Sequence, residues 1–198
     1  MAERFEVGPV EAIAAVILAV GESRRMGRPK ALLPVPGSVP QETFLDRLIG
    51  LFSAQKAHII VVLGAHSDAI RAGAARAEQA RFVVNPRPQD GQLSSLQCGL
   101  REAPEEAAGV LFTPVDFPRV SADSVAGLVA AFWRGDHAGL VIPRFQGRRG
   151  RRGTARAAAR GGEAFGARAS DVIHRHAAEA CYVDVDDPEA YRALAELE

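Results

Sequence analysis

The stretch AIAAVILAVGESRRMGRPK, residues 12–30, joins an apolar run of strand type to a loop rich in glycine and positive charge. Connections from a strand to a helix usually take about 2–6 residues and need one or two turn formers. The connection after Val20 is longer, and four cationic side chains lie from Gly21 to Lys30. No turn requires that much positive charge, so the loop is expected to hold a negatively charged ligand.

The residue types of this loop suit a polyphosphate. Gly21 and Gly27 permit backbone conformations that bring N–H groups close to a ligand, and successive N–H donors form an anion-binding nest. Ser23 adds a hydroxyl donor, Arg25 a planar guanidinium and Lys30 a mobile point charge. The loop is not GxxxxGK[ST], because no hydroxyl residue follows the lysine, and it is not GxGxxG. These features predict a triphosphate site outside the P-loop and dinucleotide-binding classes.

Apolar runs rich in valine and isoleucine alternate along the chain with segments of helical period. The runs predict strands at 13–20, 58–64, 81–84, 109–115 and 139–143. The amphipathic segments predict helices at 42–54, 66–79, 95–103 and 121–134. Near-continuous apolar strands that alternate with helices imply a parallel sheet covered on both faces. In such a sheet ligands bind beyond the carboxyl ends of the strands, which is where the loop after the first strand lies.

Length and composition predict one soluble domain over 1–198, with 1–11 as a tail. The formal net charge of zero predicts no attraction to nucleic acid or to an anionic membrane. No apolar run reaches the ~18 residues of a membrane span, and the first residues lack the apolar segment of a secretory signal. Cys98 and Cys181 lie far apart without metal-type spacing, which suits a reducing compartment. The expected location is therefore the cytoplasm.

One segment, 148–168, breaks the pattern, since 18 of its 21 residues are arginine, alanine or glycine. No hydrophobic period survives there, so a loop or a poor helix is predicted. An RNA-binding arm is the alternative, but only Phe165 supplies an aromatic ring for base stacking. The composition therefore favours a loop without nucleic-acid function.

The loop and several later segments together resemble one known family. LAVGESRRMGRPKALLPVPG, residues 18–37, is similar to the N-terminal signature LAxGxSxRMGxxKxLLPxxG of the MobA-like nucleotidyltransferases. Further matches follow in the same order: TFLDRL, VVLGAH, VVNPRPQDGQLSSLQCGL, TPVDFPRV, VIPRFQGRRG and VDVDDPEAY. The third and the last of these resemble the molybdenum cofactor cytidylyltransferases within that superfamily. The resemblance covers 12–150 and 171–192, and the abrupt change of composition between these flanks suggests a local shift in reading frame.

This resemblance implies an α/β fold, a Rossmann-like three-layer sandwich with a mostly parallel central sheet of the nucleotide-diphospho-sugar transferase type. It also implies Mg²⁺-dependent transfer of CMP from CTP to the phosphate of the molybdenum–pterin cofactor, Mo-molybdopterin, with release of pyrophosphate. Guanylyl transfer to the same cofactor and cytidylyl transfer to another phosphate are the enzymatic alternatives. A non-catalytic nucleotide-binding maturation factor is the alternative of a different class. A molybdenum hydroxylase or its maturation chaperone is the implied protein partner.

The family's functional residues carry over onto the matching positions of this chain. By this carry-over, Arg25 and Lys30 hold phosphates and stabilise the leaving pyrophosphate. Asp116, in PVDFP at the end of an apolar strand, corresponds to the family's magnesium-binding aspartate, with a turn or helix-capping role as the alternative. Magnesium is commonly held by one or two carboxylates together with substrate phosphates and water. Nucleotide contacts are also implied for Leu18, Ala19, Val20, Gly21, Ser23, Asn85, Gly91, Ser94 and Ser95.

The closing acidic motif supplies two further candidate metal ligands, Asp184 and Asp186. Alternation along a strand puts both side chains on the same face, from which one joins Asp116 directly or through water. The alternative is a capping role, since Pro188 suits the first position of a helix over PEAYRALAEL. A capping role is likewise the alternative for each of the two serines in QLSSL.

The residue before the first loop glycine tends to distinguish branches of the family, with glycine in the guanylyl branch and alanine in the cytidylyl branch. Here it is Val20, which departs from both. A side chain at this position narrows the space beside the base and should penalise a purine more than a pyrimidine. CTP is therefore expected to be preferred over GTP.

Overall fold

The computed structural model describes residues 12–21, 23, 27–38, 40–134, 140–145, 148–149, 156–159 and 180–184, and beyond 134 it describes only one side chain, that of Val141. Its strands are β1 Ala12–Ala19, β2 His58–Leu63, β3 Arg81–Val84, β4 Ala107–Pro114, β5 Leu140–Phe145, β6 Arg148–Arg149, β7 Arg156–Ala159 and β8 Ala180–Asp184. Its helices are α1 Phe44–Ser53, α2 Ser67–Gly73, α3 Gln92–Arg101 and α4 Ala122–Arg134, with short 3-10 turns η1 Lys30–Leu32, η2 Ala77–Gln79 and η3 Pro88–Asp90. Among the described residues, no helix combines the length and the apolar character needed to cross a bilayer.

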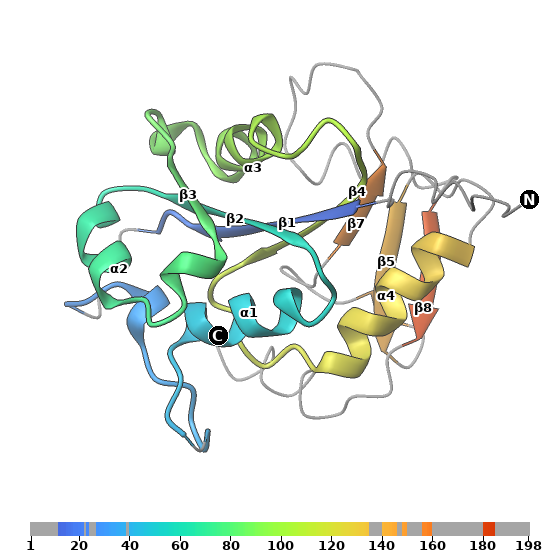
Figure 1. Cartoon of the computed structure of the whole chain (residues 1–198), viewed down its shortest axis with the longest axis horizontal. Coiled ribbons are helices and arrows are strands. Elements are labelled where there is room, and N and C mark those ends of the chain that lie inside the picture. Colours follow the sequence, from blue (N-terminus) through green and yellow to red (C-terminus); the bar gives the residue numbers. More distant parts are fainter. Residues whose placement is uncertain are drawn as a thin grey trace, which may run out of the picture.

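The first four strands build the parallel half of the sheet. β3, β2, β1 and β4 lie side by side in that order, and each adjacent pair is parallel (Figure 1). Residues 13–19 of β1 are all buried, as a strand covered on both faces requires. The parallel arrangement predicted from the apolar runs is confirmed, and each strand end falls within two residues of its expected position.

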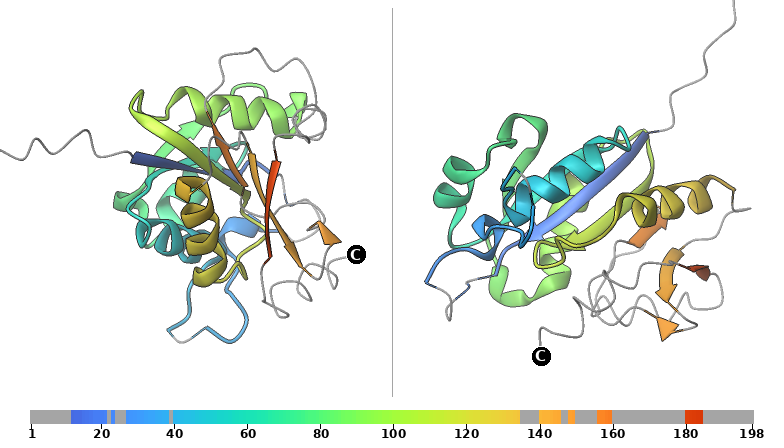
Figure 2. Two further views of the ribbon diagram at one scale, coloured as in Figure 1. Left: turned by 90° about the vertical axis from the view of Figure 1, so that its right-hand side faces the viewer. Right: turned by 90° about the horizontal axis from the view of Figure 1, so that it is seen from below.

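Helices cover both faces of the sheet, so the predicted three-layer arrangement is confirmed. α3 lies on one face, whereas α1 and α4 lie on the other (Figures 1 and 2). Alternate residues of β1 enter the two cores, so that Val16 packs on the α3 side and Ile17 on the α1 and α4 side. A side-chain carbon on Gly99 of α3 would lie 2.5 Å from Val16 Cγ1, so glycine allows α3 to pack closely here.

Burial raises the pKa of the Cys98 thiol on α3, which keeps it protonated at neutral pH.

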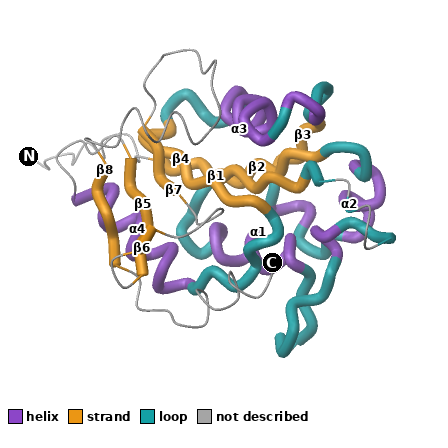
Figure 3. Tube along the Cα trace, turned by 180° about the vertical axis from the view of Figure 1, so that it is seen from behind, coloured by secondary structure: helices purple, strands orange, loops and turns teal. Residues whose placement is uncertain are grey.

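The other half of the sheet, in which β7, β5 and β8 follow β4 (Figure 3), is mixed in direction. β7 pairs antiparallel with β4 on one side and with β5 on the other, and β8 runs parallel to β5. The loop or poor helix predicted over 148–168 is therefore wrong for the two strands β6 and β7, and the rest of that segment lies outside the described residues. The backbones of β4 and β5 supply hydrogen-bonding partners to β7 from both sides. The hydrophobic periodicity of a segment carries no information about such partners, so the strand could not be predicted from it.

Two of the four predicted helices differ from the structure by more than two residues at one end. The segment predicted as one helix over 66–79 is divided into α2 and η2, because α2 ends at Gly73 and Ala74 is extended. Glycine is a poor helix former and commonly marks a helix end. The helix predicted over 95–103 begins at Gln92, directly after Gly91 with its φ of +91°. Glycine adopts this conformation without strain and so sets the start of α3.

Candidate functional site

Four parallel strands end at the same edge of the sheet, and the residues that follow them form the candidate site. Leu18 in β1 stands beside Pro114 in β4, and two residues further along the strands come Val20 and Asp116. The N–H of Val115 donates to the Leu18 carbonyl at 3.0 Å, which keeps the two chains together past the end of β4. This is the edge at which parallel α/β sheets bind their ligands.

Lys30 and Asp116 meet at this edge. Nζ of Lys30 donates to Oδ2 of Asp116 at 3.4 Å, although 86 positions separate the two residues in the sequence. Their side chains are 44% and 38% exposed, so both remain accessible to a ligand. Asp116 does not cap α4, because the Oγ of Ser121 accepts the Ser124 N–H at 3.1 Å at the start of that helix. The structure therefore brings together the loop cation and the strand-end carboxylate that the sequence singles out.

Ser23 holds the backbone of the lysine in place. Its Oγ accepts the Lys30 N–H at 2.9 Å, and its hydroxyl lies 3.5 Å from the Gly21 carbonyl oxygen. Ser23 has a φ of +48°, a left-handed conformation that residues other than glycine rarely adopt. The long contact to Gly21 leaves the hydroxyl proton able to turn towards a ligand. Gly27 also has a positive φ, of +65°, and Arg25 lies outside the described residues.

The side chains of two residues predicted to contact the nucleotide are buried in the sheet. Leu18 is 7% exposed and Ala19 is 3% exposed, and they pack into opposite cores. Only their backbone atoms are able to face a ligand, and the Leu18 carbonyl already accepts a hydrogen bond from the chain. Val20 is partly exposed and Gly21 is exposed. Side-chain access to the site therefore begins at Val20.

Asn85 follows β3 at the same edge and organises the loop before α3. It is 5% exposed, and its Nδ2 donates to the Oγ atoms of Ser94 and Ser95 at 2.9 and 3.0 Å. Its Oδ1 accepts the Arg87 N–H at 3.0 Å. Gly91 is the N-cap residue of α3, so the capping role considered for the two serines is wrong. The structure brings these predicted residues together, and their hydrogen bonds to one another set the shape of the loop.

Replacement of Asn85 by alanine is expected to lower the free energy of unfolding by roughly 2 kcal/mol, because buried polar groups lose their partner. The shift of the urea midpoint measures this change. The control is Gln89→Ala, which removes an exposed side chain from the same loop and should change the free energy by less than about 0.5 kcal/mol. Equal stability of Asn85→Ala and the wild type would show that the loop does not depend on this cluster.

Asp184 ends β8 at the edge that carries Asp116, but not beside it. β4 and β5 run in the same direction, since each is antiparallel to β7, and β8 is parallel to β5. The order β4-β7-β5-β8 puts three strand spacings, about 14 Å, between β4 and β8. The side chain of Asp184 and the whole of Asp186 lie outside the described part of the chain. Their role at a metal stays a prediction.

Asp116 is suited to share a divalent cation with substrate phosphates. In the part of the chain that the structure describes, no group of three or more His, Cys, Asp or Glu residues could hold a metal ion. Mg²⁺ usually takes one or two carboxylates and completes its shell with water and phosphate oxygens. An accessible carboxylate beside an accessible lysine therefore fits a Mg²⁺–nucleotide complex.

Gly64 is a further residue of the site, beyond those predicted from the sequence. A side-chain carbon there would lie 2.6 Å from the Val20 carbonyl oxygen and 2.9 Å from Val20 Cγ1. Only glycine lets the end of β2 approach Val20 this closely. The sequence feature that points to Gly64 is the motif VVLGAH, in which a glycine directly follows an apolar run.

A cavity of about 400 Å³ lies at the opposite edge of the sheet, where the strands begin. Its lining includes Ala12 and His58, the first residues of β1 and β2, and Trp133 near the end of α4. It shares no residue with the candidate site. The chemistry predicted from the loop after β1 therefore does not involve this cavity.

Comparison with known proteins identifies relatives of this chain. Residues 15–197 match the family model described as the MobA-like NTP transferase domain. A probable molybdenum cofactor guanylyltransferase from Rhodopirellula baltica is 37% identical over 129 residues, which are 64% of this chain and 58% of that protein. The molybdenum cofactor guanylyltransferase of Sinorhizobium fredii is 37% identical over 122 residues, 62% of this chain and 54% of that protein. The chain thus spans somewhat more than half the length of these curated relatives.

Solved structures share the fold over most of the chain. Rv0371c from Mycobacterium tuberculosis superposes with a TM-score of 0.69 at 23% identity, covering 93% of this chain and 97% of that protein. Its homologue from Mycobacterium sp. strain JC1 gives a TM-score of 0.64 at 25% identity, covering 93% and 96%. The α/β fold of the nucleotide-diphospho-sugar transferase type is thereby confirmed.

Proposed function

Because the chain belongs to the MobA-like NTP transferase family, we propose that it transfers a nucleotidyl group from a nucleoside triphosphate to a phosphate-bearing acceptor. The observation that supports this most strongly is the 3.4 Å approach of Lys30 Nζ to Asp116 Oδ2. A cation for phosphates and a carboxylate for a divalent cation stand side by side there, at the ligand-binding edge of the sheet. A site for an uncharged ligand would need neither group.

In the proposed reaction an oxygen of the acceptor phosphate attacks the α-phosphorus of the triphosphate. The bond between that phosphorus and the oxygen bridging to the β-phosphate breaks, and pyrophosphate leaves with the electron pair. Lys30, together with Arg25 in the family's pattern, neutralises the charge that gathers on the leaving group. The backbone around Gly21 holds the triphosphate in line for attack. When bound, Mg²⁺ would offset phosphate charge beside Asp116.

The acceptor that we propose is the phosphate of Mo-molybdopterin. The names of the curated relatives from Rhodopirellula baltica and Sinorhizobium fredii support this choice. A molybdenum hydroxylase or its maturation chaperone would then receive the product. Cytidylyl transfer to another phosphate is the alternative that the loop chemistry equally allows.

Val20 favours CTP as the donor, whereas the names of the relatives favour GTP. A carbon added to Gly64 would meet Val20 Cγ1 at 2.9 Å, so the valine side chain packs against the end of β2. Val20 is partly exposed and directly precedes Gly21, so in the proposed site it would narrow the space beside the base, where a purine needs more room than a pyrimidine. On this steric ground CTP is the proposed donor, and guanylyl transfer is the second candidate.

Pyrophosphate release with Mo-molybdopterin and Mg²⁺, measured separately with each triphosphate, should be faster with CTP than with GTP. Val20→Ala should raise the GTP rate relative to the CTP rate by roughly tenfold, because one or two methyl groups in a pocket are worth about 1–3 kcal/mol. The control is Val84→Ala at the exposed end of β3, which should leave the ratio unchanged. Faster turnover of GTP by the wild type would refute the preference for CTP. No release with either triphosphate would refute the proposed function.

A further inference from the structure

We propose that Asp46 is a positioning residue for Lys30, because its buried carboxylate fastens together the two segments that hold η1. Asp46 lies in the first turn of α1 and is 4% exposed. Burial of a carboxylate is costly unless hydrogen bonds compensate it, so the hydrogen-bond partners of Asp46 explain why it is buried. The inference rests on the proposed function only in that Lys30 is taken to neutralise the charge of the leaving pyrophosphate.

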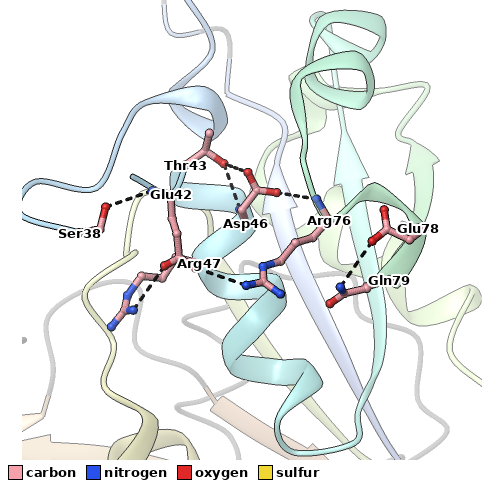
Figure 4. Close-up of polar contacts among 8 residues, drawn as sticks. All are labelled: Ser38, Glu42, Thr43, Asp46, Arg47, Arg76, Glu78 and Gln79. Carbon is pink, nitrogen blue, oxygen red and sulfur yellow. Dashed lines mark hydrogen bonds and ion pairs between the residues drawn. The ribbon is translucent and has the colours of Figure 1, made fainter. Parts of the chain in front are cut away.

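The two carboxylate oxygens of Asp46 accept hydrogen bonds from two different segments (Figure 4). Oδ2 accepts from the Thr43 hydroxyl at 2.6 Å, and Thr43 Oγ1 in turn accepts the Asp46 N–H at 3.1 Å. Oδ1 accepts the backbone N–H of Arg76 at 2.9 Å, from the loop between α2 and η2. Asp46 therefore ties the start of α1 to that loop.

Both segments in turn hold η1, whose first residue is the lysine of the site. On the α1 side, the Phe44 N–H donates to the carbonyl of Leu33, directly after η1, at 2.9 Å. On the α2 side, Gly73 lies against Leu32, since an added side-chain carbon would meet Leu32 Cδ1 at 2.8 Å. η1 is thus held by a hydrogen bond on one side and by packing on the other. Asp46 fixes the distance between these two supports.

The ion pairs around Asp46 do not share this role. Glu42 pairs with Arg47 at 3.6 Å and with Arg76 at 3.5 Å, and the arginine side chains are 38% and 39% exposed (Figure 4). Exposed pairs of this kind contribute little to stability. Glu42→Gln is therefore a matched control, because it removes the same charge from the rim of the same network.

Hydrogen–deuterium exchange tests the position of η1 without reference to activity. In Asp46→Ala the peptide covering 29–35 should exchange about tenfold faster than in the wild type. Asp46→Asn keeps one oxygen to accept the Arg76 N–H, and its amide nitrogen can donate to the Thr43 hydroxyl, so exchange should stay within about threefold of the wild type. Glu42→Gln should exchange at the wild-type rate. Faster exchange in the Arg76 loop alone, with 29–35 unchanged, would overturn the proposal. Should Asp46→Ala fail to fold, Thr43→Val removes the hydroxyl donor and should speed exchange in the same peptide.

A kinetic experiment asks whether Asp46 acts through Lys30. Asp46→Ala should lower kcat for pyrophosphate release about tenfold in the wild type but less than about twofold in Lys30→Ala, since residues that act together are not additive. Asp46→Asn should restore most of kcat. Equal losses in both backgrounds would overturn the proposal. A wild type that releases no pyrophosphate would refute the proposed function instead, and the exchange measurement would still decide how η1 is held.

Discussion

Asp116→Ala should reduce pyrophosphate release by at least about 100-fold, while the chain still binds nucleotide weakly. The substitution removes the carboxylate that stands 3.4 Å from Lys30 at the strand ends, where the phosphate charge must be neutralised. The fold should persist, because an ion pair this exposed contributes at most about 1 kcal/mol to the free energy of unfolding. Single-turnover release of pyrophosphate and a thermal melt measure the two effects.

The same variant separates an enzyme from a non-catalytic nucleotide-binding maturation factor, which has no turnover to lose. The control is Asp123→Asn, which removes an exposed acid from the first turn of α4 and should retain full activity. Full activity in Asp116→Ala would contradict the proposed site.

The effect of Asp116→Asn on the affinity for triphosphate should reverse when the divalent cation is added, which gives a second test of Asp116. Without the cation, Asp116→Asn should bind triphosphate more tightly than the wild type, because one negative charge no longer faces the phosphates. With Mg²⁺ it should bind more weakly, because the cation loses a carboxylate ligand. Titration calorimetry in EDTA and in Mg²⁺ measures both affinities. Weaker binding in both buffers would argue against a role as a metal ligand.

Lys30→Ala is expected to lower kcat/KM for the triphosphate by about 100-fold, because charge on the phosphates and the leaving group loses its mobile cation. The lost ion pair is exposed, so the melting temperature should change little. The chain offers a matched control, since Lys56 is the only other lysine. Lys56 is exposed and lies just before β2, at the opposite edge of the sheet, and Lys56→Ala should keep the wild-type rate. Similar losses in the two variants would contradict a specific role for Lys30.

The protection of Lys30 and Lys56 by a bound triphosphate can also be compared within one molecule. Acetic anhydride acetylates both amines, and mass spectrometry measures each site separately. A Mg²⁺–triphosphate complex at ten times its Kd should slow acetylation of Lys30 about tenfold, since only the free fraction reacts, and should leave Lys56 unchanged. Protection of neither lysine, or of both equally, would show that the triphosphate does not bind at the loop after β1.

The edge at which Lys30 and Asp116 lie could be predicted because it follows from strand direction. Apolar runs separated by helices form a parallel sheet, and the carboxyl ends of its strands share one edge. The residues that follow the first and fourth predicted strands therefore lie at the same edge, and the adjacency of β1 and β4, which the structure shows, brings them together. The hydrogen bonds of Asn85 could not be predicted in this way, because the same side chains would serve equally well to contact a ligand or to shape their own loop.

The sequence by itself determined the parallel half of the sheet and the edge that carries the site, because burial on both faces and chain direction follow from local periodicity. Only the tertiary structure decided that β7 enters the sheet, since its four residues are paired by β4 and β5 and not by any pattern of their own. It also decided the role inferred for Asp46, whose partner Arg76 lies 30 positions away in the chain. Both features depend on contacts between distant segments, and such contacts exist only once the chain has folded.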